Sequence, residues 1–209
     1  ALLSRGLGDV YKRQGLDPLR YYLIKEVSFG NDGNISQERL EDCINSDLAN
    51  NYGNLCQRVT AFAIKNCDGK IPSIVKFQDE DLLILNKFKD NLDNIRSKID
   101  DQNINFYIGY IVNSLFEANK YFNDQEPWKK KDDLLRLSTI VYTALEIIRK
   151  ISFLLYPIIP ASSLKALKIF DIKENKVKLS TITNNEFLTK GNNLNKIDIL
   201  FKKIEKNND

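Results

Sequence analysis

The sequence contains neither histidine nor methionine among its 209 residues. Without histidine the chain cannot form a Ser-His-Asp triad, a Cys-His pair or an imidazole metal ligand. A glycine-rich phosphate loop is missing too, because GLGDVYK near the start lacks the Gly-Lys-Ser/Thr ending of a P-loop. We therefore expect no catalytic residue, no metal site and no bound cofactor in this chain alone. The first residue is not an initiator methionine, so we expect the chain to be a piece of a longer product.

The sequence has few cysteines, no long apolar run and only a small net charge. The three cysteines, Cys43, Cys56 and Cys67, are too widely spaced for a CxxC pair, and their odd number suits free thiols in a reducing compartment. The most apolar run, 151–161, is too short to span a bilayer and contains two prolines, and no secretory signal is present. These features predict a soluble, cytoplasmic protein without a membrane partner. The net charge of +3 permits a polyanionic partner but does not require one.

Apolar residues recur at helical spacing through most of the chain, which predicts an all-α fold. Residues 1–14 are set aside because they resemble a translated sequencing adapter, with an ordinary flexible N-terminus as the alternative. The rest predicts a short leading module over 15–36, an antiparallel helical bundle over 37–172 and a C-terminal extension over 173–209. The expected helices cover about residues 19–27, 37–50, 51–66, 79–99, 104–122, 134–156 and 161–170.

Two of the expected helices begin at recognisable capping residues. Asp17 followed by Pro18 predicts an N-cap with proline at the first helical position, opening the short leading helix. Ser36 is the expected N-cap of the helix that follows. Between them the stretch SFGNDGNIS is rich in glycine, asparagine and aspartate, so it predicts a turn region.

Asn54 and Arg58 stand four residues apart in the stretch LANNYGNLCQRVTAFAIKN. This spacing projects both side chains from one face of the expected helix, beside its apolar stripe. Asparagine offers a donor and an acceptor from one amide, and arginine offers a planar fork of donors. Together they can read the Watson–Crick edge of an unstacked base. A solvated helix face with an ordinary polar pair is the alternative, and spacing alone does not decide between the two.

The only tryptophan, Trp128, lies in NDQEPWKKKDD, between two expected helices. Pro127 prevents helix continuation and favours an extended conformation at Glu126, so we expect the indole on a connection and at least partly exposed. Unpaired RNA bases stack on such aromatic planes, and the three lysines that follow would attract phosphate. The alternative is a tryptophan that covers the end of the bundle next to a solvated run of charges.

These stretches together resemble one family, the methionyl-tRNA synthetases, which are class I aminoacyl-tRNA synthetases. GLDPLRYYLIKEVSFGNDGNIS resembles the segment that follows their signature lysine loop. LANNYGNLCQR resembles the opening helix of their anticodon-binding domain, with its Asn-x-x-x-Arg pattern at Asn54 and Arg58. FEANKYFNDQEPW resembles the Pro-Trp turn of the same domain, and IDILFKKIE resembles the family's C-terminus. The resemblance covers Gly15 to about Glu205.

The resemblance implies a stem-contact module followed by a helical anticodon-binding domain. In the family the tryptophan stacks on the first anticodon base, a cytosine, while the asparagine and arginine hydrogen-bond to anticodon bases. It therefore implies that Asn54, Arg58 and Trp128 bind RNA and select the CAU anticodon of methionine-accepting tRNA, both initiator and elongator. It also implies that the chain is the C-terminal part of a monomeric, cytoplasmic methionine–tRNA ligase, with 173–209 packing back toward the catalytic body.

The sequence departs from the family in what it lacks. The family's His-rich adenylate motif and its Lys-Met-Ser-Lys-Ser loop need residue types that are absent here. The catalytic domain, which uses ATP, and any zinc-binding insertion are thus expected only in the full-length enzyme, and this piece should be inactive alone. Two alternatives stay open: the same domain from the valine, isoleucine or leucine synthetases, or a non-enzymatic helical scaffold that binds protein through a large apolar patch.

Overall fold

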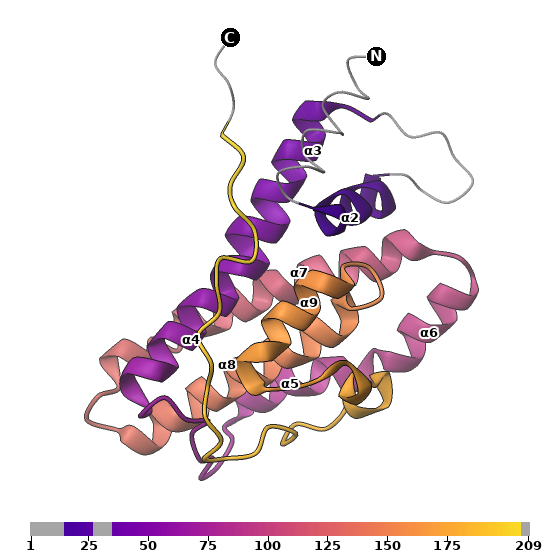
Figure 1. Cartoon of the computed structure of the whole chain (residues 1–209). Coiled ribbons are helices and arrows are strands. Elements are labelled where there is room, and N and C mark those ends of the chain that lie inside the picture. The colour runs from indigo at the N-terminus through magenta and orange to yellow at the C-terminus, as the bar shows by residue number, and fades with distance from the viewer. Residues whose placement is uncertain (1–14, 27–34, 206–209) are drawn as a thin grey trace.

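The computed structural model describes residues 15–26 and 35–205, and within them helices are the only regular elements besides one isolated bridge between Lys70 and Asn193 (Figure 1). The predicted all-α fold is confirmed. The expected foreign leader, 1–14, lies outside the described residues. The α-helices are α2 (Leu16–Glu26), α3 (Gln37–Cys43), α4 (Asn54–Asn66), α5 (Asp79–Asp90), α6 (Leu92–Asp100), α7 (Ile104–Asp124), α8 (Leu134–Leu155) and α9 (Pro160–Leu167).

A single helical rod runs from Gln37 to Asn66, where two helices were expected (Figure 1). The Ser36 hydroxyl accepts a hydrogen bond from the Arg39 backbone N–H at 3.2 Å, which confirms Ser36 as the N-cap. Between α3 and α4 the backbone winds as a π-helix over Ile44–Gly53. Its wider turns carry this stretch, which contains three asparagines, through without ending the rod.

The bundle is organised around α8, in which every residue from Thr139 to Leu155 is buried. This helix packs against α4, α5, α7 and α9, and a helix covered on all sides is largely apolar all round. The helix expected over 79–99 is two helices, α5 and α6, because the backbone turns at Asn91. The Asn91 amide donates to the Lys87 carbonyl at 2.9 Å, and such local side-chain bonds compete with the helical pattern.

Helix α2 is tied to the start of α9 by a buried carboxylate. The prediction that Asp17 caps α2 is wrong, because the helix already begins at Leu16. Instead the Asp17 carboxylate accepts a hydrogen bond from the backbone N–H of Ser162, in the first turn of α9, at 2.6 Å. Arg20 adds a bond to the Ile158 carbonyl at 2.8 Å. Local sequence could not reveal this cap, since its two partners lie 145 residues apart.

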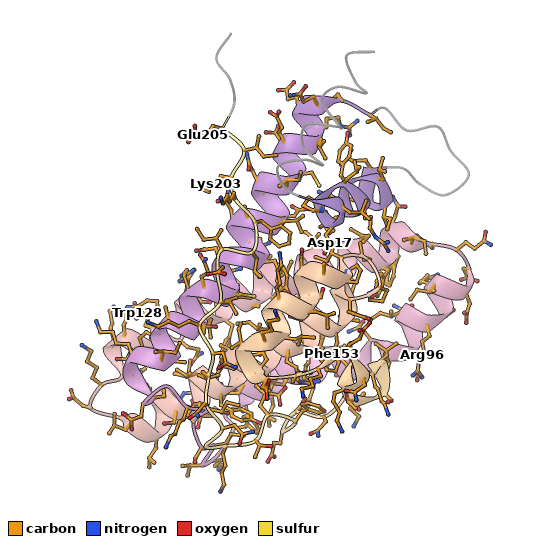
Figure 2. All side chains as sticks on the ribbon, in the orientation of Figure 1. Asp17, Arg96, Trp128, Phe153, Lys203 and Glu205 are labelled. Carbon is orange, nitrogen blue, oxygen red and sulfur yellow. The ribbon has the colours of Figure 1, made fainter. Side chains whose placement is uncertain are left out.

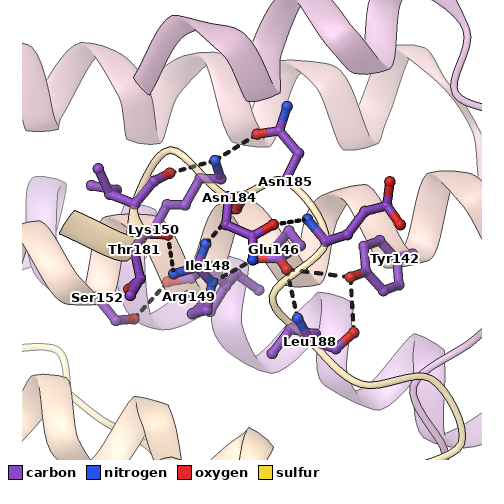
Figure 3. Close-up of polar contacts among 12 residues, drawn as sticks. Tyr142, Glu146, Ile148, Arg149, Lys150, Ser152, Thr181, Asn184, Asn185 and Leu188 are labelled. Carbon is purple, nitrogen blue, oxygen red and sulfur yellow. Dashed lines mark hydrogen bonds and ion pairs between the residues drawn. The ribbon is translucent and has the colours of Figure 1, made fainter. Parts of the chain in front are cut away.

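The C-terminal extension is held by a buried charged cluster on α8, formed by Glu146, Arg149 and Lys150 (Figure 3). The Glu146 carboxylate accepts from Arg149 Nε at 2.5 Å and from the backbone N–H of Leu188 at 2.7 Å. Arg149 also donates to the Asn184 carbonyl at 2.9 Å. The charges of Glu146 and Arg149 are therefore compensated by each other and by backbone groups of the extension, as burial requires.

Lys150 holds the same segment from the next position of α8. Its amine donates to the Ile182 carbonyl at 2.6 Å and to the Asn185 side-chain oxygen at 2.7 Å. Burial, reinforced by the neighbouring positive charge of Arg149, lowers the pKa of Lys150 to about 7. A neutral amine still has two N–H donors, so both hydrogen bonds survive deprotonation.

After this cluster the extension runs back beside the rod toward α3 (Figure 1). The Asn45 side chain pairs with both backbone groups of Ile204, at 2.8 and 2.9 Å. The extension passes close to Gly53, where a Cβ would lie at an ordinary contact distance of 3.6 Å from the Phe201 ring and at 3.1 Å from the Leu48 carbonyl oxygen of the rod itself. The extension thus contacts the rod along its length and braces the helix that carries Asn54.

Candidate nucleic-acid interface

The turn after α7 places the only tryptophan at one end of the bundle. Glu126 adopts a left-handed conformation, with φ 42° and ψ 57°, and Pro127 then opens a short 3-10 helix, Pro127–Lys129. The prediction of an extended Glu126 is therefore wrong. A proline disfavours chiefly the right-handed helical region in the residue before it. A left-handed residue commonly ends a helix, and here the Glu126 carbonyl accepts from the Lys129 N–H at 2.8 Å.

A buried ionic network anchors this turn to the bundle. Asp81, at the start of α5, is fully buried and binds the Arg136 guanidinium through two contacts of 2.5 and 3.0 Å. Arg136 also donates to the Gln125 side-chain oxygen at 2.6 Å, directly before the turn. The Tyr121 hydroxyl donates to the same Asp81 carboxylate, and burial raises the pKa of Tyr121 well above its usual value. Three helices thus meet at one carboxylate beside the Pro-Trp turn.

The Trp128 side chain is 40% exposed, as expected. The edge-to-face packing of its indole against the Phe122 ring, with centroids 6.2 Å apart and planes at 71°, holds it in place. Figure 2 shows Trp128 at the end of the bundle away from Lys203 and Glu205. Lys129 pairs with Glu126 at 2.7 Å, and the two lysines that follow are exposed. Part of a flat aromatic surface is thus open to solvent beside positive charge.

Arg58 reaches the same end of the bundle from α4. Its Nη2 donates to the Asn123 side-chain oxygen at 2.6 Å, and its Cζ lies 5.8 Å from the centre of the Phe122 ring. One hydrogen bond uses one of the five N–H donors of the guanidinium. Since the side chain is only partly buried, the remaining donors can serve a ligand.

Asn54 lies one helical turn before Arg58 and is partly buried. Its side chain makes no hydrogen bond to another of residues 15–26 or 35–205. Asn54 and Arg58 therefore share one face of α4, as predicted. The Asn54 amide is not hydrogen-bonded by the described residues, and the Arg58 guanidinium is held by one hydrogen bond. Lys65 is exposed further along the same helix.

Phe122 is the residue that sequence reasoning missed. It is 2% exposed, and its ring lies between Arg58 and Trp128, contacting both. The sequence showed it only as one apolar residue of a helix, and nothing in its spacing distinguishes it from the core. Two other residues of the same motif are structural: Asn119 donates to the Asn51 side chain of the rod at 2.6 Å, and Tyr121 belongs to the buried network.

The candidate metal ligands and the cysteines of the described residues form no further site. No group of three or more potential metal-ligating side chains occurs among residues 15–26 and 35–205. Cys43, Cys56 and Cys67 are free, as predicted, and burial raises the pKa of Cys43 to about 12 and that of Cys67 to about 11. In the same part of the chain, none of the helices has the length and apolar character needed to cross a membrane.

Comparison with protein families gives two matches. Residues 71–209 match the family described as the anticodon binding domain of methionyl tRNA ligase, and residues 7–60 match the class I tRNA synthetases of the methionine type. The second match begins inside the segment 1–14, so the boundary at residue 15 remains a prediction.

Comparison with individual proteins agrees. Methionine–tRNA ligase of Brucella suis is 37% identical over 187 residues, which cover 86% of this chain and 36% of the relative. The Thermotoga maritima ligase is 34% identical over 211 residues, which cover 97% of this chain and 33% of the relative. The apo structure of Mycobacterium tuberculosis methionyl-tRNA synthetase superposes with a TM-score of 0.88 at 32% identity, covering 96% of this chain and 41% of that one. The chain thus spans about a third of the length of the curated relatives it matches.

Proposed function

Because the chain belongs to the family of methionyl tRNA ligase anticodon-binding domains, we propose that it binds methionine-accepting tRNA, initiator and elongator, and recognises the anticodon CAU. The observation that carries this proposal is the position of Trp128. The indole is 40% exposed at the end of the bundle and packs at 71° against the Phe122 ring, which also contacts Arg58. A stacking surface and a fork of donors thus lie together beside exposed lysines.

The three side chains divide the work of recognition by their chemistry. The Trp128 face stacks on the first anticodon base. Stacking does not distinguish one base from another, but it orients this base so that its edge can be read. Arg58 and Asn54 hydrogen-bond to base edges, where the planar fork and the two-sided amide discriminate one base from another. The lysines after Trp128 attract the phosphates, which adds affinity without sequence information.

The larger enzyme is the natural setting for this domain. We place the chain at the C-terminal end of a cytoplasmic, monomeric methionine–tRNA ligase whose catalytic domain uses ATP and, where it has a metal-binding insertion, zinc. In that setting residues 15–36 form the stem-contact module, 37–172 the anticodon-binding domain, and 173–209 pack back toward the catalytic body. The network that joins α2 to α9 supports a fixed orientation between module and bundle, through Asp17 and Ser162.

The two alternatives are less well supported. The family and relatives reported above are all methionine enzymes, which does not favour a valine, isoleucine or leucine synthetase. A protein-binding scaffold does not account for a tryptophan and an arginine that share one positioning ring beside exposed lysines.

A binding panel tests the proposal directly. The chain is titrated with stem-loop RNAs that carry the anticodons of methionine, valine, isoleucine and leucine tRNAs, at several salt concentrations. We expect the CAU stem-loop to bind most tightly and its affinity to fall as salt rises, because lysine–phosphate contacts release counterions. Equal affinity for all four would contradict anticodon recognition. The absence of any salt-dependent binding would favour the scaffold alternative.

A further inference from the structure

Phe122 lies where the two predicted RNA-binding elements meet. It belongs to the last turns of α7, whereas Arg58 comes from α4 and Trp128 from the turn after α7. The guanidinium carbon of Arg58 is 5.8 Å from the centre of the Phe122 ring, and the Trp128 ring centre is 6.2 Å away. With 2% exposure, Phe122 itself cannot offer a ligand more than a trace of surface.

The two contacts differ in physical character. A cation is attracted to the electron-rich face of an aromatic ring, and a second aromatic ring at 71° meets it in an edge-to-face arrangement. A flat ring can serve both contacts at once, whereas an aliphatic side chain of similar size provides neither. Asn123, the next residue, holds the same guanidinium, because its side-chain oxygen accepts a hydrogen bond from Arg58 Nη2 at 2.6 Å.

We infer that Phe122 is a positioning residue, which sets the direction of the Arg58 fork relative to the Trp128 plane before any ligand arrives. Its consequence for RNA rests on the proposed anticodon recognition, but its effect on Trp128 does not. Long side chains lose freedom when they bind, and holding them in the bound arrangement removes part of that cost. Without the ring, Trp128 and Arg58 remain present but no longer pack against the same side chain.

Trp128 makes this inference measurable without RNA, because it is the only tryptophan in the chain. All indole fluorescence therefore reports the environment of this one side chain. Phe122→Leu should move the Trp128 emission to longer wavelength and make it easier to quench with acrylamide, because the ring that packs against the indole is gone. Phe122→Met fills more of the vacated volume and should give the same shift if the leucine variant folds poorly.

Phe62→Leu is the matched control. The Phe62 ring packs edge-on against Phe122 at 5.9 Å from the α4 side, and it is partly buried. This variant removes an aromatic ring from the same cluster, so it should lower the melting temperature without changing the Trp128 emission. The contrast separates a general loss of packing from a loss of the specific contact to the indole.

The RNA consequence is tested with the CAU stem-loop. An edge-to-face contact contributes roughly 0.5–1.5 kcal/mol, so Phe122→Leu should weaken binding about two- to twelve-fold. In a Trp128→Ala background the same substitution should have a smaller effect, because part of it acts through the indole. If folded Phe122→Leu and Phe122→Met keep the wild-type emission and affinity, Phe122 is only a core residue and the inference is wrong. If the emission shifts but neither Phe122→Leu nor Trp128→Ala affects RNA binding, positioning stands and the proposed function falls.

Discussion

Arg58 is held from two sides, by the Asn123 amide at 2.6 Å and by the Phe122 ring at 5.8 Å. Neither contact neutralises its charge, so the guanidinium stays positive and most of its donors remain available. A side chain held in this way is suited to reading a base edge, where direction matters more than charge. An arginine that only attracted phosphate would need no such support.

Arg58→Lys separates these two roles, because it keeps the charge and removes the planar fork. A good bidentate contact to a base is worth roughly 1–3 kcal/mol, so affinity for the CAU stem-loop should fall about 5- to 150-fold. Stem-loops with other anticodons should be affected much less. Lys65→Arg, an exposed charge-conserving change on the same helix, serves as control and should leave binding nearly unchanged. Uniform weakening across all anticodons would instead make Arg58 a backbone contact.

At the scale of the elements, the Pro-Trp turn depends on three helices that meet at Asp81. This carboxylate accepts from Tyr121 and Arg136 and from the backbone N–H of Gln78 at 2.8 Å, where it completes a capping box at the start of α5. Since Arg136 in turn holds Gln125, the position of Trp128 depends on this buried network beside the turn.

Asp81→Asn keeps the shape but removes the charge that compensates Arg136. Breaking a buried pair on one side leaves an uncompensated charge, so we expect a loss of roughly 3–5 kcal/mol in the free energy of unfolding. Asp124→Asn removes the carboxylate of an exposed pair with Lys120 and should cost roughly 0–1 kcal/mol. Chemical denaturation followed by circular dichroism measures both. Similar small losses in the two variants would show that the network does not anchor the turn.

Much of this arrangement was predictable from sequence, for identifiable reasons. The bundle helices follow from apolar periodicity, and Ser36 works as a cap because its partner lies three residues away. The π-helical stretch, the cap that Asp17 provides for α9 and the left-handed Glu126 were not predictable, because each depends on tertiary packing or on distant partners. The role of Phe122 was not predictable for another reason, because it depends on contacts to two other elements.

At the scale of the whole molecule, the C-terminal extension is fastened to α8 by buried charges, and one of them titrates near neutral pH. Burial and Arg149 lower the pKa of Lys150 in the folded chain to about 7, whereas the unfolded lysine titrates near its ordinary value of 10.5. Between these two pH values the unfolded chain binds more protons than the folded chain. The stability contribution of Lys150 therefore rises with pH in this window and is smallest below about pH 7.

Lys150→Met tests this linkage. The free energy of unfolding of the wild type, measured between pH 7 and 8, should rise more steeply with pH than that of Lys150→Met, by up to ~1.4 kcal/mol per pH unit. The window stays below the range in which the thiols of the unfolded chain ionise, since the raised pKa values of Cys43 and Cys67 would act in the opposite direction. Lys165→Met, at an exposed position of α9, is the control. Parallel pH dependence in wild type and Lys150→Met would contradict the lowered pKa.

The most direct test of the central claim, that Trp128 is exposed because RNA stacks on it, is one variant measured in two ways. Trp128→Ala is titrated with the CAU stem-loop, and its unfolding is followed by circular dichroism, since the variant has no tryptophan fluorescence. Base–aromatic stacking is worth roughly 1–3 kcal/mol, so we predict binding about five- to a hundred-fold weaker, with little loss of stability. A stability loss of roughly 3–5 kcal/mol together with unchanged RNA affinity of the folded protein would make Trp128 a core residue and contradict the account.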